Sequence, residues 1–345
     1  MKKAAVVFAA LSLAVPPAYP HVPVQLATSG KTVACPEPGG FEAYSPIVSR
    51  VGPPDAAVLE IFSGAATSAI AVHQLTPPER VRLQNALAKL PRLHRDVLQR
   101  HLRRLSFLDL ESGGGSALTS KVGPDDASTL FDITFRASLL DESLTKFLNT
   151  KEARLFVDDG SGFSVEFDAG PADALTYVLL HEATHIVDQV LGLTDDAAGP
   201  FMSGVWADVR ALSQPHADSL AASTPFRRQP PIPLRYAPAY YESLRQSPFV
   251  SFYATAAASE DVAELLAWQQ LAMRFNQPLT LTVRDNQRVA VYRYEPLAGP
   301  AIQSRFADWQ ELLSRHEQGS LLCAGEVSGV EAVRTTGTMQ AAARD

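Results

Sequence analysis

Cysteine is scarce in this chain of 345 residues, where Cys35 and Cys323 are the only two. Both lie outside the stretch that carries the histidines and acids described below, so we expect no cysteine ligand for a metal there. In an oxidising compartment an even pair favours one disulfide, here between the N-terminal and the C-terminal segment. Two unrelated thiols are the alternative.

Long apolar runs are also missing. The uncharged run at residues 4–15 is too short to span a bilayer, and the apolar stretch 175–190 is interrupted by histidines and acids. We therefore expect no stable membrane insertion. Two lysines precede the run at 4–15 and small residues follow it, which is the pattern of a secretory signal peptide over residues 1–20. The mature chain is then expected to be secreted or periplasmic.

Neither positive nor negative charge is in strong excess, and several common motifs are absent. The net charge is -7 and the pI is near 5.6, so we expect neither nucleic acid nor an anionic membrane as partner. The basic run 92–104 carries its apolar residues at helical spacing, which indicates an amphipathic helix. The glycine-rich segment 112–116 lacks the Gly-Lys-Ser/Thr ending of a phosphate-binding loop. No G-x-S-x-G motif supports serine-hydrolase chemistry.

An HExxH motif is the most informative feature that is present. It occupies residues 181–185, with apolar residues on both sides that predict a helix with a buried face. Positions i and i+4 share one face of a helix, so His181 and His185 can bind the same metal ion. Glu182 can then reach a water on the open side of that ion. Two core histidines on an amphipathic helix are the alternative.

A catalytic zinc ion needs a third protein ligand. Leu191 stands where a metzincin would carry its third histidine, so that class is excluded. The best candidate is Glu260, on a second predicted helix with Ser259 as its N-cap. Glu264 lies one turn further on the same face, so one carboxylate can bind the metal and the other can orient a ligating imidazole. Asp188, on the face of the two histidines, is the other candidate for orienting an imidazole.

These residues together resemble the gluzincins, and among them most closely the anthrax-lethal-factor-like group. The group continues its first motif with Val and Asp, as Val187 and Asp188 do here, and takes its third ligand from an E-x-x-A-E run, matching Glu260 and Glu264. A tyrosine seven residues before that glutamate stabilises the transition state in the group, matching Tyr253. The resemblance covers residues 170–200 and 250–270. The G-x-M-E-N pattern of gluzincin aminopeptidases is absent, which argues against trimming of N-termini.

The implied activity is that of a zinc metallopeptidase, a hydrolase acting on a protein or peptide substrate. One Zn²⁺ held by His181, His185 and Glu260 would lower the pKa of a bound water, and Glu182 would accept its proton and deliver it to the leaving amine. Tyr253 would donate a hydrogen bond to the developing oxyanion, although plain packing within an aromatic stretch is its alternative. A catalytically inactive zinc-binding module acting in protein or cell-wall binding is the second functional hypothesis. No feature specifies an oligomeric state.

The expected fold is α+β and zincin-like: a small mixed or antiparallel sheet, then the HExxH helix, then a mainly helical C-terminal half. A hairpin is predicted from residues 154–157 and 163–167, and the second of these strands is our candidate for pairing with substrate backbone. A second hairpin is predicted over 279–294, followed by a helix over 301–316. The boundaries are a signal peptide at 1–20, an extended N-terminal arm at 21–60, a catalytic domain at 61–320 and a C-terminal tail at 321–345. Within that domain we expect a helical lead-in at 76–106, a sheet at 130–168 and active-site helices at 171–193 and 259–275.

Overall fold

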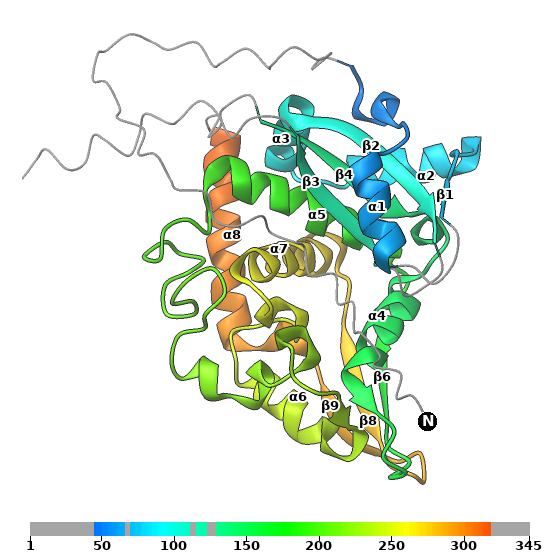
Figure 1. The fold of residues 1–345 in the computed structure, drawn as a ribbon. Helices are drawn as coiled ribbons and strands as arrows, with labels where there is room; N and C mark the ends of the chain where they lie inside the picture. The colour runs from blue at the N-terminus through cyan, green and yellow to red at the C-terminus, as the bar shows by residue number, and fades with distance from the viewer. Residues whose placement is uncertain (1–44, 66–69, 111–114, 123–128, 319–345) are drawn as a thin grey trace, which may run out of the picture.

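The computed structural model describes residues 45–65, 70–110, 115–122 and 129–318. The predicted signal peptide, most of the N-terminal arm, the C-terminal tail and both cysteines lie outside these residues. The described part is α+β, with eight α-helices and small sheets (Figure 1). The helices are α1 (Ala56–Ala65), α2 (Pro77–Ala88), α3 (Arg92–His101), α4 (Leu144–Glu152), α5 (Ala174–Leu191), α6 (Ala237–Arg245), α7 (Ala258–Phe275) and α8 (Pro300–Gln318). None of these described helices is long and apolar enough to cross a bilayer.

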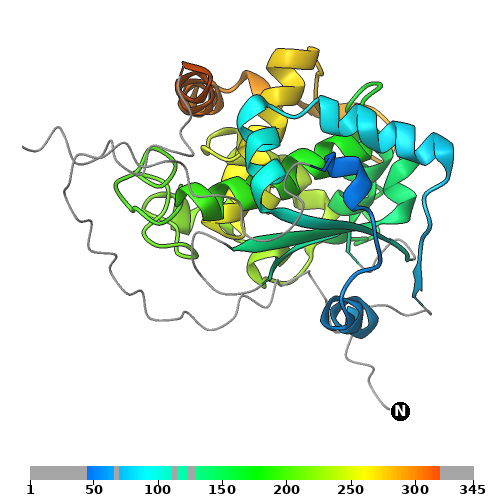
Figure 2. The ribbon, with the colours of Figure 1, turned by 90° about the horizontal axis from the view of Figure 1, so that it is seen from above.

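A four-stranded sheet lies beside the helix that carries the HExxH motif. Its order is β1-β2-β4-β3, with β2 and β4 parallel and the other two pairs antiparallel. Helices α2, α3 and α5 cover one face and α1 packs on the other (Figure 2). Strand β3 is therefore an edge strand, and it also contacts α5. The strands are β1 (Ala71–Val72), β2 (Leu102–Asp109), β3 (Ala117–Val122) and β4 (Leu130–Arg136).

The predicted helical lead-in differs from the structure at its C-terminal end. Thr76 and Glu79 form a capping box at the start of α2, but α3 ends at His101, and the chain from Leu102 forms β2. Residues 105–108 are all buried because helices cover both faces of the sheet. Such a run matches a buried strand as well as a helix, and the leucine spacing alone did not distinguish them.

A three-stranded antiparallel sheet extends away from the first one, in the order β6-β8-β9. Its strands are β6 (Ser164–Asp168), β8 (Thr280–Arg284) and β9 (Ala290–Tyr294), so the predicted hairpin over 279–294 and the helix after it are confirmed. The predicted hairpin over 154–167 is wrong. The two residues of β5 (Phe156–Val157) pair with β7 (Ile232–Pro233), while β6 pairs along its full length with β8, which offers five partners.

Helices α5 and α7 cross at the centre of the molecule (Figure 1). Asp173 caps α5 by accepting a hydrogen bond from the Thr176 N–H, and Gly192 ends it at a φ of 65°, which favours glycine. Helix α7 begins after Ala257, so the predicted N-cap Ser259 lies inside its first turn instead. The HExxH motif lies well inside α5, whereas Glu260 lies in the first turn of α7, so the start of α7 is part of the geometry of the site.

Candidate metal centre

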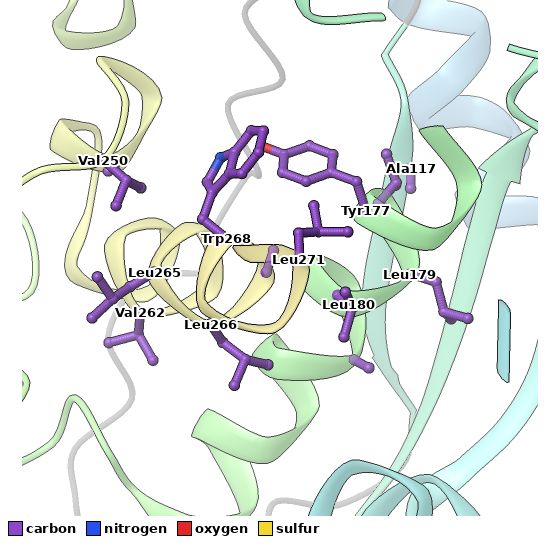
Figure 3. Close-up of a cluster of buried hydrophobic side chains, with 14 of the residues drawn as sticks. Ala117, Tyr177, Leu179, Leu180, Val250, Val262, Leu265, Leu266, Trp268 and Leu271 are labelled. Atoms are coloured by element: carbon purple, nitrogen blue, oxygen red, sulfur yellow. The ribbon is translucent and has the colours of Figure 1, made fainter. Parts of the chain in front are cut away.

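Apolar contacts fix α5 against α7. The side chains of Leu180 on α5 and of Leu266 and Leu271 on α7 are almost completely buried between the helices (Figure 3). The rings of Tyr177 and Trp268 meet across the same contact, with their centroids 5.5 Å apart. Densely packed interiors of this kind tolerate little movement. The relative position of the histidines on α5 and the acids on α7 is therefore fixed by the core.

The two histidines and Glu260 converge on one point. His181 Nε2 lies 3.2 Å from His185 Nε2 and 3.1 Å from Glu260 Oε2, and His185 Nε2 lies 3.6 Å from the same oxygen. All three side chains are buried, and among the described residues they form the only group of three potential ligands brought this close. The structure thus brings together the three residues that the sequence predicts as ligands.

The spacing of these donor atoms fits a tetrahedral metal ion. Nitrogen and oxygen donors at about 2.0–2.2 Å from one zinc ion lie about 3.3–3.6 Å from each other. The distances of 3.1–3.6 Å between the three donors are close to this range. Two imidazoles and one carboxylate are also a ligand set that catalytic zinc sites use. The residues present therefore fit a zinc ion.

The electrostatics of the cluster favour a bound cation. Burial alone would lower the pKa of His181, but the carboxylates of Glu260 and Glu264 raise it to about 10. Burial would raise the pKa of Glu260, but the charges and hydrogen bonds of His185 and His181 hold it well below its usual range. The carboxylates around the two histidines therefore need a positive counter-charge, and a zinc ion would supply it.

Glu264 lies on the far side of His181 from Glu260. Its Oε1 is 3.2 Å from His181 Nδ1, and its carboxylate accepts hydrogen bonds from Ser251 Oγ at 2.6 Å and from the Tyr177 hydroxyl. Burial opposes ionisation, yet Lys151 and His181 lower the pKa of Glu264 to about 2. A carboxylate beside Nδ1 favours the tautomer that leaves Nε2 of the same ring free to bind a metal. Glu264 is thus placed to orient His181.

Asp188 has a different surrounding. Its carboxylate accepts hydrogen bonds from the backbone N–H of Thr194, at 2.9 Å, and from the hydroxyl of the same residue. Burial raises the pKa of Asp188, and these hydrogen bonds oppose the effect. Asp188 therefore holds the turn that follows α5, and of the two acids proposed to orient an imidazole, Glu264 is the one seen beside a ring nitrogen.

Glu182 projects from α5 toward the four-stranded sheet. Its Oε2 accepts a hydrogen bond of 2.7 Å from the hydroxyl of Thr119 on β3, and its backbone carbonyl lies 3.3 Å from the same hydroxyl. The Glu182 side chain is nevertheless 8% exposed, so a small opening to solvent remains. The edge strand of the sheet therefore sets the orientation of the carboxylate that follows the candidate ligand His181.

Tyr253 lies beside His181, with the two ring centroids 5.8 Å apart. It begins the short 3-10 turn η8 (Tyr253–Thr255), which contacts α7. Phe226, in the turn η6 (Pro225–Arg227), packs edge-on against the ring at 5.1 Å. Burial and the negative charges of Glu260 and Glu182 raise the pKa of Tyr253 well above its usual value. The phenol therefore keeps its proton and can donate a hydrogen bond in the site.

Several contacts of the site could not be found from the sequence. Thr119, Tyr177, Ser251 and Lys151 all contact a predicted site residue, but each lies between 13 and 113 positions along the chain from the residue that it contacts. None belongs to a recognisable motif. Tyr177 lies one turn before His181 on α5 and Ser251 lies two residues before Tyr253, but the residue type of neither gave a signal of its role.

No protein-family model, curated protein or solved structure matches this chain. What the site can do is therefore inferred from its own residues.

Proposed function

We propose that this chain is a zinc-dependent peptidase of gluzincin type with a zincin-like fold, secreted or periplasmic, that hydrolyses peptide bonds in a protein or peptide. One observation carries the proposal: the three predicted ligands converge, Tyr253 packs beside His181, and the charge of Glu182 acts on both His185 and Tyr253. A metal-binding module without catalysis has no need of a carboxylate and a phenol beside the ion. The signal-peptide pattern supports the proposed location.

Each residue has a separate chemical role in this proposal. Zinc, when bound by His181, His185 and Glu260, supplies a Lewis acid that makes a water acidic near neutral pH. Glu182 accepts the water proton and passes it to the leaving amine, as a general base and then a general acid. Tyr253 donates a hydrogen bond to the oxygen on which negative charge develops. Thr119 holds the Glu182 carboxylate, and Glu264 holds His181.

The edge strand next to the site is β3 rather than β6. An exposed strand edge can pair with an extended peptide through backbone hydrogen bonds. Strand β6, the sequence-based candidate, belongs to the other sheet, whereas β3 contacts α5 and reaches Glu182 through Thr119. We therefore place the substrate backbone along β3, which brings its carbonyl groups toward the carboxylate of Glu182.

Metal content is the first test. The chain is purified without chelator, and zinc is measured by elemental analysis beside the variants His185→Ala and Glu260→Ala. We expect about one zinc per chain in the wild type and a loss in both variants. Glu317→Ala, which removes an exposed acid from α8, serves as the matched control and should keep its zinc. Absence of zinc from the wild type even after reconstitution would refute the proposal.

Cleavage of a diverse peptide library is the second test, read by mass spectrometry. Glu182→Gln should retain zinc and lose at least about 10²–10³-fold in rate, because it removes the proton acceptor. Tyr253→Phe should retain zinc and lose about 10²-fold, the effect of removing one oxyanion donor. A zinc-loaded wild type with no cleavage in any peptide or protein pool would instead identify a zinc-binding module without catalysis.

A further inference from the structure

Lys151 approaches the site from a helix that bears none of the predicted site residues. It lies near the C-terminal end of α4, with its ammonium nitrogen 3.8 Å from the centroid of the Tyr253 ring. The same nitrogen is 3.4 Å from Glu264 Oε1 and 5.9 Å from the centre of the Tyr177 ring. Its side chain is 15% exposed. A lysine is therefore held mostly out of water between two aromatic rings and an acid.

These contacts are stronger here than they would be on the surface. An ammonium over an aromatic face is attracted by the negative charge of the π system, and the attraction grows when water is excluded. The carboxylate of Glu264 is 1% exposed and supplies the counter-charge. Because both contacts use one nitrogen, Tyr253 and Glu264 are connected through Lys151. Tyr253 is the proposed oxyanion donor, and Glu264 lies beside the proposed ligand His181.

We propose that Lys151 is a positioning residue for Tyr253. It holds the face of the ring so that the phenol stays directed at the metal centre. Phe226 packs edge-on against the same ring, so the aromatic side chain is restrained by at least two neighbours from different elements. The inference deepens the proposed function and rests on it, since the position of Tyr253 matters most if its hydroxyl takes part in catalysis.

A purely local role for Lys151, as the counter-charge of Glu264 alone, makes a different prediction. In that case its removal would disturb Glu264, then His181, and finally zinc affinity. If Lys151 acts on Tyr253, its removal leaves zinc bound and disturbs the ring. The two roles are thus separated by measuring the metal and the tyrosine independently.

The first experiment does not depend on activity. Fluorotyrosine is incorporated into the full-length zinc-loaded chain, and the resonance of Tyr253 is assigned with Tyr253→Phe in ¹⁹F NMR spectra. We expect this resonance to move or broaden in Lys151→Met and to stay unchanged in Lys146→Met. Lys146 lies on the same helix and is exposed, so it is a matched control. An unchanged Tyr253 resonance in Lys151→Met would overturn the inference, whether or not the chain is a peptidase.

The second experiment is a double-mutant cycle on peptide cleavage. Lys151→Met should lower kcat about tenfold, change KM little and keep its zinc, as expected for loss of one desolvated cation–π contact. In the Tyr253→Phe background the same substitution should cost far less, because the hydroxyl that it positions is gone. An equal loss in both backgrounds, or loss of zinc from Lys151→Met, would overturn the inference.

A charge-retaining variant covers the case in which Lys151→Met does not fold. Lys151→Arg keeps a cation that can stack on the ring, whereas Lys151→Gln does not. We expect Lys151→Arg to keep more kcat than Lys151→Gln at equal zinc content. The reverse order would overturn the inference. Absence of cleavage by the wild type would count against the proposed function alone, because the NMR measurement still tests the contact.

Discussion

Thr119 Oγ1 donates a hydrogen bond of 2.7 Å to Glu182 Oε2, and so joins the edge strand β3 to the acid of the HExxH motif. The two residues are 63 positions apart in the chain. The strand proposed to bind substrate backbone and the carboxylate proposed to move protons are therefore parts of one hydrogen-bonded unit. A substrate paired with β3 would lie at a fixed distance from Glu182.

Thr119→Val should slow catalysis without releasing the metal. Valine keeps the size of threonine but removes the hydroxyl, so the Glu182 carboxylate loses one restraint and a hydrogen bond to a charged group worth about 1.5–3 kcal/mol. We expect kcat to fall about tenfold, with zinc content unchanged by elemental analysis. Thr119→Ser should retain most of the rate, and Ser120→Ala, on the opposite face of the strand, should retain all of it. A full rate in Thr119→Val would show that the contact has no part in catalysis.

Glu264→Gln should weaken zinc binding. The amide is neutral, so His181 loses the ionised acceptor opposite its Nδ1, and substitution of such a partner typically costs about 10–100-fold in metal affinity. The dissociation constant is measured by competition with a chromophoric chelator. Asp188→Asn is the matched control because that acid hydrogen-bonds to Thr194, and we expect its effect on zinc to be much smaller. Equal losses of zinc affinity in Glu264→Gln and Asp188→Asn would contradict the different roles assigned to the two acids.

The three candidate ligands could be predicted from the sequence because each lies in a helix. Spacing of four residues places His181 and His185 on one face whatever the rest of the fold does, and the same holds for Glu260 and Glu264. Helix propensity and capping are local properties, so the two helices were also predicted within a few residues of their ends. What the sequence leaves open is how the helices meet.

The residues that support the site could not be predicted because their contacts are not local. Thr119 and Lys151 are ordinary residues until the sheet and α4 fold against α5 and α7. The sheet pairing itself shows the same limit. Phe156 and Phe167 are close in sequence and favoured a hairpin, but β8 offers β6 a longer partner from more than a hundred residues away. Strand pairing depends on which of the possible partner strands, here β5 or β8, pairs with β6, and a local sequence pattern does not predict this.

His94 should make the protein less stable in mild acid. His94 is completely buried, and its Nε2 lies 3.1 Å from the hydroxyl of Thr184. Because that hydroxyl donates its proton to the Leu180 carbonyl, the imidazole must be the donor in its hydrogen bond with Thr184. Burial, helped by the charge of His316, lowers the pKa of His94 from 6.5 to about 3. Between these values the unfolded chain binds a proton that the folded chain does not. Stability from this group is therefore complete above about pH 6.5 and is lost progressively as the pH falls toward 3.

The measurement is urea unfolding at pH 7.5 and pH 5.0. On going from pH 7.5 to pH 5.0, the free energy of unfolding of the wild type should fall by about 2 kcal/mol more than that of His94→Gln, since glutamine does not titrate. His216→Gln alters a histidine that is only partly buried, so it should change this difference less. Identical pH dependence in the wild type and His94→Gln would show that His94 is protonated in the folded state as readily as in the unfolded one.

Asp261 and Arg305 form a buried charged pair that should be costly to break. The Arg305 guanidinium donates two hydrogen bonds, of 2.8 and 2.7 Å, to the Asp261 carboxylate. The same carboxylate accepts a hydrogen bond of 2.8 Å from Trp206 Nε1. The side chain of Asp261 is 0% exposed and that of Arg305 is 8% exposed. Asp261→Asn or Arg305→Met leaves one buried charge uncompensated, so each should cost about 3–5 kcal/mol in urea unfolding. Glu166→Gln, in a pair whose side chains are 35% and 50% exposed, should cost less than about 1 kcal/mol.

The same pair should also affect the metal, because Asp261 follows Glu260 directly in the first turn of α7. Its bonds to Arg305 on α8 and Trp206 in the preceding loop hold that turn in place, and the position of Glu260 depends on it. We expect the double variant Asp261→Leu/Arg305→Leu to recover much of the stability lost in the single variants, since no charge is left unpaired. It should still bind zinc more weakly than the wild type, because the first turn of α7 has lost its polar anchor. Full zinc affinity in the double variant would instead show that the apolar contact between α5 and α7 is sufficient to place Glu260.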